Sequence, residues 1–74
     1  MNKIFVIREE EEVITARDTM NNAIAACVNR MVICGYTCES IDCYEHVTLI
    51  AYRDHTANET RTMIIEEVSY REGV

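Results

Sequence analysis

The sequence predicts a single two-layer α+β domain over residues 1–74, with one helix packed on one face of a mostly antiparallel sheet. A chain of 74 residues has the length of one domain. One segment, residues 16–34, repeats apolar residues with a helical period, whereas the other apolar segments are short and rich in β-branched residues. The predicted order is β-α-β-β-β, or β-α-β-β if the weakest strand does not form.

Residues 3–8 are predicted to form the first strand. The run Ile4 to Ile7 is apolar on both faces, which suits a strand in the interior of a sheet. Four consecutive glutamates, residues 9–12, follow it. Because adjacent like charges repel, this run is expected to be a solvated loop or strand end. It directly precedes the predicted helix, whose N-terminal dipole favours negative charge.

The helix is predicted over residues 16–34, with Thr15 as its N-cap, Asp18 in the capping-box position and Gly35 as its C-cap. Its apolar residues fall on one stripe, made of Ala16, Met20, Ala23, Ile24, Cys27, Val28, Met31 and Cys34. This stripe is interpreted as the side that packs on the sheet, because no second helix is predicted that could supply a core.

The second half of the chain is predicted to be β structure. A weak strand over residues 36–43 is followed by a turn at Glu45 and His46 and by a clear strand over residues 47–53. A polar loop, residues 54–59, joins this strand to the last one, residues 60–70, as a hairpin. Residues 71–74 are expected to fray.

One helix can cover only one face of such a sheet, so an apolar face is expected to remain. Strand alternation assigns to it a candidate interface of Phe5 or Ile7 together with Ile50, Tyr52, Met63 and Ile65. A second copy of the chain or another protein would cover this face. The alternative is a strongly curled sheet that hides these residues itself.

The charge balance favours a protein partner with a basic surface. Lys and Arg number 7 against 13 Asp and Glu, a formal net charge of −6. Direct binding of nucleic acid or of an anionic membrane is therefore disfavoured. An acidic protein suits a surface that itself binds nucleic acid, although the same charge also keeps a small protein soluble.

No catalytic, cofactor or metal site is expected from the remaining chemistry-bearing residues. The four cysteines have the spacing C-x6-C-x3-C-x4-C, which lacks the C-x2-C pair of a zinc site, and Cys27 and Cys34 are interpreted as small buried hydrophobes. Cys43 and His46 are a sequence-local pair, but no substrate pocket accompanies them. Without an export signal or a membrane span in this sequence, a cytosolic location with reduced thiols is expected.

This layout resembles the small, acidic, single-domain inhibitors of the anti-CRISPR type that phages and mobile elements encode. The shared features are the short chain, the strand followed by one helix and an antiparallel hairpin, and the acidic clusters. The resemblance implies a cytoplasmic inhibitor, in the host cell if phage-encoded, that blocks a nucleic-acid-binding defence complex such as a CRISPR effector. The implied partner-binding residues are Glu9, Glu10, Glu11, Glu12, Glu66, Glu67 and Glu72.

Two other functions stay open at this point. The β-α-β-β order also resembles dodecin, an oligomeric flavin-binding protein, although the aromatic position that stacks on the flavin is not evident here. The cysteines leave a third class, a metal-binding or redox module.

Overall fold

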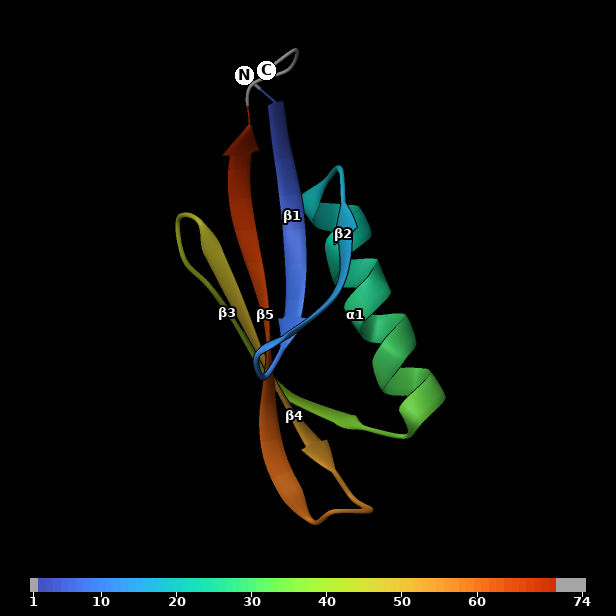
Figure 1. The fold of residues 1–74 in the computed structure, drawn as a ribbon. Helices are drawn as coiled ribbons and strands as arrows, with labels where there is room; N and C mark the ends of the chain where they lie inside the picture. The colour runs from blue at the N-terminus through green and yellow to red at the C-terminus, as the bar shows by residue number, and fades with distance from the viewer. Residues whose placement is uncertain (1, 71–74) are drawn as a thin grey trace.

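The computed structural model describes residues 2–70 and shows one helix on one face of a five-stranded antiparallel sheet (Figure 1). This confirms the predicted α+β class. The sheet has the strand order β2-β1-β5-β4-β3. The elements are β1 (Asn2–Glu9), β2 (Glu12–Arg17), α1 (Met20–Cys34), β3 (Thr37–Cys43), β4 (Val47–Asp54) and β5 (Glu59–Tyr70). No helix in this described part is long and apolar enough to cross a membrane. The predicted frayed tail, residues 71–74, lies outside the described residues.

Strand β2 forms where the sequence predicts the acidic loop and the start of the helix. After β1 the chain reverses at Glu10 and Glu11, so that Glu12–Arg17 returns antiparallel along β1. The β-branched run from Val13 to Thr15 favours a strand over a helix. The observed order is therefore β-β-α-β-β-β, which also differs from the β-α-β-β layout of dodecin.

The helix consequently begins later than predicted. Its N-cap is Thr19, whose hydroxyl accepts a hydrogen bond from the Asn22 amide at 3.1 Å; Thr15 is not the cap. The C-cap prediction is confirmed: Gly35 has the left-handed φ of 74°, which a glycine adopts without steric cost. The weak strand also forms, as β3.

The core lies between α1 and the face of the sheet beneath it. Its buried side chains on the sheet are Ile7, Ile50, Tyr52, Met63 and Ile65, and those on the helix are Ala23, Cys27 and Met31. Phe5 packs against the same cluster. The predicted apolar interface is therefore wrong for this structure. The alternation along each strand was assigned correctly, but the helix covers the face that was predicted to stay open.

The uncovered face of the sheet carries the opposite set of residues. Ile50 pairs with Met63 on the helix side, so their neighbours Leu49 and Ile64 pair on the open side. An ion pair between Arg8 Nε and Glu66 Oε1, at 3.0 Å, lies on this open face. The half-buried apolar residues around it are Ile4, Val6, Val47, Leu49, Ala51 and Ile64.

Candidate functional site

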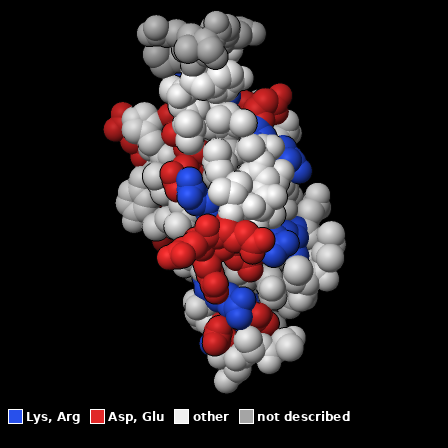
Figure 2. All heavy atoms as spheres, in the orientation of Figure 1, with Lys and Arg blue, Asp and Glu red and all other residues white. Residues whose placement is uncertain are grey.

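The acidic run forms a tight turn that projects from the end of the β1–β2 hairpin. Glu9 ends β1 and lies opposite Glu12, the first residue of β2, and Glu10 and Glu11 connect them. Glu10 has a φ of 58°, a left-handed conformation that costs a non-glycine residue about 1 kcal/mol. Glu10, Glu11 and Glu12 are exposed. In Figure 2 acidic atoms gather near the middle of the view, where Figure 1 shows the turn between β1 and β2.

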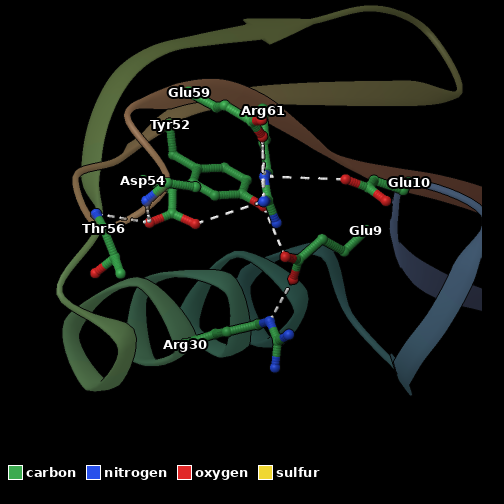
Figure 3. Close-up of polar contacts among 9 residues, drawn as sticks. Glu9, Glu10, Arg30, Tyr52, Asp54, Thr56, Glu59 and Arg61 are labelled. Atoms are coloured by element: carbon green, nitrogen blue, oxygen red, sulfur yellow. Dashed lines mark hydrogen bonds and ion pairs between the residues drawn. The ribbon is translucent and has the colours of Figure 1, made fainter.

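Glu9 differs from its three neighbours because its side chain turns inward and is only 11% exposed. One carboxylate oxygen accepts a hydrogen bond from the Tyr52 hydroxyl at 2.7 Å, and the other accepts one from Arg30 Nε at 2.5 Å (Figure 3). Burial and this hydrogen bond raise the pKa of Tyr52, and the bond to Glu9 raises the pKa of Arg30. Tyr52 also stacks on Tyr36, with ring centroids 4.7 Å apart. These two hydrogen bonds hold Glu9, at the base of the turn, against β4 and α1.

Arg61 connects the same turn to the loop between β4 and β5 (Figure 3). Its guanidinium lies 3.2 Å from Glu59, 3.7 Å from Asp54 and 3.9 Å from Glu10. The hydrogen bond to Glu59 is the main reason that the pKa of Arg61 is raised. Asp54 is almost fully buried, and its carboxylate accepts hydrogen bonds from the backbone amides of Thr56 and Ala57 at 3.0 and 3.2 Å. The loop and the turn are therefore joined through one cation.

The second predicted acidic cluster does not join the first. Glu66 and Glu67 point to opposite faces of β5, and their partners on β1 are Val6 and Phe5. Val6 is three positions from Glu9, so Glu66 lies roughly 10 Å from the acidic turn at 3.3 Å per residue. The third member, Glu72, lies outside the described residues.

Both described members of that second cluster are neutralised within the protein. Glu66 pairs with Arg8 at 3.0 Å. Glu67 lies 2.6 Å from His46 Nδ1 and 3.3 Å from Lys3 Nζ, and the hydrogen bond from His46 followed by that from Lys3 lowers the pKa of its carboxyl group. This leaves Glu10, Glu11 and Glu12 as the predicted acidic residues that project into solvent.

Arg30 and Arg61 are site residues that the sequence did not reveal, and Tyr52 was named only for the apolar interface and not as a partner of Glu9. Arg30 and Tyr52 are 21 and 43 positions from Glu9 in the chain. No local motif links residues so far apart, and a basic residue on a helix is normally interpreted as solvated. The strand order, which places β5 beside β1 and β4 beside β5, and the packing of α1 on the sheet together bring these side chains to the turn.

A groove of about 290 Å³ lies between α1 and β2. The sheet contributes Ile7, Ile14, Thr15 and Arg17 to its lining, and the helix contributes Ala26, Cys27, Asn29, Arg30, Ile33 and Cys34. Cys27 is buried, which raises the pKa of its thiol from 9.0 to about 11. The groove is mainly apolar at its helix wall, where Ile33 is 83% exposed.

The cysteines are all free thiols and are not clustered. Cys27 is buried as expected, but Cys34, the last residue of α1, is exposed, as are Cys38 and Cys43 on the edge strand β3. Over residues 2–70 no group of three or more His, Cys, Asp or Glu side chains is arranged to hold a metal ion. His46, the neighbour of Cys43 in the sequence, contacts Glu67.

We compared the chain with protein-family models, with curated protein sequences and with solved structures, and none of them matches it.

Proposed function

We propose that this protein is a binding protein that docks the acidic turn Glu10–Glu12 onto a basic protein surface, as an inhibitor of the anti-CRISPR type would do. The observation that carries the proposal is the presentation of three solvent-exposed carboxylates on a hairpin turn whose base is fixed by buried contacts. Because the turn is fixed by Glu9, little conformational entropy is lost when its carboxylates meet a partner.

The distribution of charge supports this surface over the other acidic positions. Glu11 and Glu12 have no cationic partner among residues 2–70, and Glu10 has only the distant contact to Arg61 at 3.9 Å. The charge of a carboxylate without a nearby cation is not neutralised, so it attracts the basic surface of a partner. This attraction speeds association with the partner and favours basic partners over others. A groove that normally binds the phosphates of a nucleic acid has the complementary charge.

The proposal is tested with purified CRISPR effector complexes loaded with guide RNA. The wild-type protein is expected to bind at least one such complex and to slow cleavage of its target DNA. Binding should weaken steeply as salt is raised, because exposed charges are screened. The double variant Glu10→Lys and Glu11→Lys should lose both binding and inhibition, with far-ultraviolet circular dichroism unchanged.

A matched control carries the same change of net charge elsewhere. Asp42 and Glu45 are exposed on and just after β3, the edge strand opposite β2, and the double variant Asp42→Lys and Glu45→Lys should inhibit as the wild type does. Equal loss in both variants would show that only bulk charge matters and would contradict a specific turn. Inhibition that survives Glu10→Lys and Glu11→Lys, or no binding to any effector complex, would overturn the proposal.

A further inference from the structure

The two edges of the sheet, β2 and β3, each pair with only one strand of the described chain. An unpaired edge presents a row of backbone donors and acceptors that can bind another strand. β3 is exposed along its whole length, but its charged residues, Glu39 and Asp42, are both acidic. Pairing β3 with a second β3 would bring like charges together, which disfavours it.

Strand β2 has the opposite property, because it carries both signs of charge. It begins with Glu12 and ends with Arg17. Neither side chain contacts an opposite charge within residues 2–70; Arg17 Nη1 hydrogen bonds only to Thr15 Oγ1 and, at 2.9 Å, to the Ala16 carbonyl of its own strand. The edge is therefore charge-complementary to an antiparallel copy of itself.

An irregularity in β2 places these two charges on the same face. Residues five apart in a regular strand point to opposite faces. Here the register shifts beside Ile7, so that Glu12 lies opposite Glu9 and Arg17 lies opposite Phe5. Glu9 and Phe5 share the helix side of β1, so Glu12 and Arg17 also share it. By the same register, Val13 and Ala16 lie on the open face, opposite Arg8 and Val6.

Exposed apolar side chains lie on β2 and beside it in a single copy of the chain. Val13 is 52% exposed on the strand, and Ile33, which lines the groove beside β2, is 83% exposed on α1. The groove between α1 and β2 has Ile14 on its sheet side and Ile33 on its helix side. Apolar patches beside an unpaired edge are typical of an interface.

We propose that β2 is a homodimer interface, at which two copies of this chain pair their β2 strands antiparallel about a two-fold axis between Ile14 and Thr15. In this register Glu12 of each copy faces Arg17 of the other, and Val13 faces Ala16. Because the two-fold axis of such an antiparallel pair is perpendicular to the sheet, both helices lie on the same side of a continuous ten-stranded sheet. The two grooves then adjoin across the shared strands, and each acidic turn lies roughly 20 Å from its copy.

Sedimentation velocity of charge-exchange variants tests this register. The wild type is expected to sediment at twice the 8.5 kDa mass of one chain at micromolar concentration. Glu12→Lys and Arg17→Glu should each raise the dimer dissociation constant at least about tenfold, since each places like charges opposite one another. Circular dichroism of each variant confirms that it is folded.

Mixing the two single variants provides the decisive measurement. In a mixed pair the new cation of the Glu12→Lys chain meets the new carboxylate of the Arg17→Glu chain, and the native Arg17 of the first meets the native Glu12 of the second. The mixture is therefore expected to dimerise more tightly than either variant alone, and the double variant should dimerise by itself. A monomeric wild type, a dimer insensitive to both variants, or a mixture that stays monomeric would overturn the proposal.

The dimer interface and the inhibitory surface proposed above share Glu12, but Glu10 and Glu11 belong to the inhibitory surface alone and Arg17 to the interface alone. The variant Glu10→Lys and Glu11→Lys leaves Glu12 and Arg17 unchanged and is expected to remain a dimer. Loss of inhibition with the dimer intact, or of the dimer with inhibition intact, separates failure of one proposal from failure of the other.

Discussion

Cys27 is a titratable side chain buried in the middle of α1, where it packs in the core with Ala23 and Met31. Burial disfavours the thiolate and raises the pKa of Cys27 from 9.0 to about 11. Since the thiolate is the nucleophile, this thiol is expected to be inert near neutral pH. The other three cysteines, Cys34, Cys38 and Cys43, are exposed.

Alkylation followed by mass spectrometry should therefore separate Cys27 from the other thiols. At pH 8 in native buffer, iodoacetamide is expected to modify Cys34, Cys38 and Cys43, while Cys27 reacts at least about a hundredfold more slowly because of its raised pKa and its burial. In denaturant all four should react alike. Equal labelling of Cys27 and Cys34 in the native protein would contradict the buried position.

The raised pKa of Cys27 also makes the free energy of unfolding depend on pH. The folded state holds the Cys27 proton more tightly than the unfolded state, so its contribution to stability is complete below pH 9.0 and is lost as the pH rises to about 11. The raised pKa of Tyr52 acts in the same direction.

The caps of α1 show how a single element acquires its boundaries. Thr15, Asp18 and Thr19 are all residue types that cap helices, so several helix starts are compatible with the sequence. Pairing of Glu12–Arg17 with β1 removes the earliest one, and the Thr19 hydroxyl satisfies the Asn22 amide. The left-handed Gly35 then ends the helix, and its amide and that of Tyr36 bond the Val32 and Met31 carbonyls.

Replacing Thr19 by alanine should lower the free energy of unfolding by about 1 kcal/mol, because the Asn22 amide loses its partner. Thr19→Ser keeps a capping hydroxyl and should retain nearly all the stability. Urea unfolding followed by circular dichroism measures both. If Thr19→Ala and Thr19→Ser destabilise the protein equally, the cap does not stabilise the helix as described.

At the scale of the whole molecule, the position of the helix decides which face of the sheet becomes the core. Adjacent residues of β5 have opposite environments: Ile65 is fully buried beneath α1, while Ile64 lies half-buried on the uncovered face. The two side chains have the same size and chemistry, so a comparison between them isolates the effect of the face.

Truncating Ile65 to alanine is expected to cost about 2–5 kcal/mol, because it opens a cavity in the core. Ile64→Ala should cost only about 1–2 kcal/mol, since less apolar surface is buried there. Thermal or urea denaturation of the two variants at the same concentration gives the difference. A similar loss at both positions would mean that the open face is also covered in solution, and a larger loss at Ile64 would reverse the assignment of the core.

Much of the secondary structure could be predicted from local patterns, and the errors have physical causes. The first strand, the helix body, its Gly35 cap and the β4–β5 hairpin follow from apolar periodicity and from glycine. β2 was missed because four consecutive glutamates suggested a loop, whereas two of them form the turn and the other two end the flanking strands. Of the seven glutamates predicted to bind a partner, Glu10, Glu11 and Glu12 are exposed in the structure.

By itself the sequence determined the α+β class, the alternation of each strand and the acidic excess, because these depend on composition and on short-range period. The tertiary structure alone decided that α1 covers Ile50, Tyr52, Met63 and Ile65, and that Glu9 turns inward to Tyr52 and Arg30. Alternation defines two faces but does not label them, since either set of apolar residues could meet the helix. Only the strand order and the direction of the β2–α1 connection fix which set is buried and which charges stay in water.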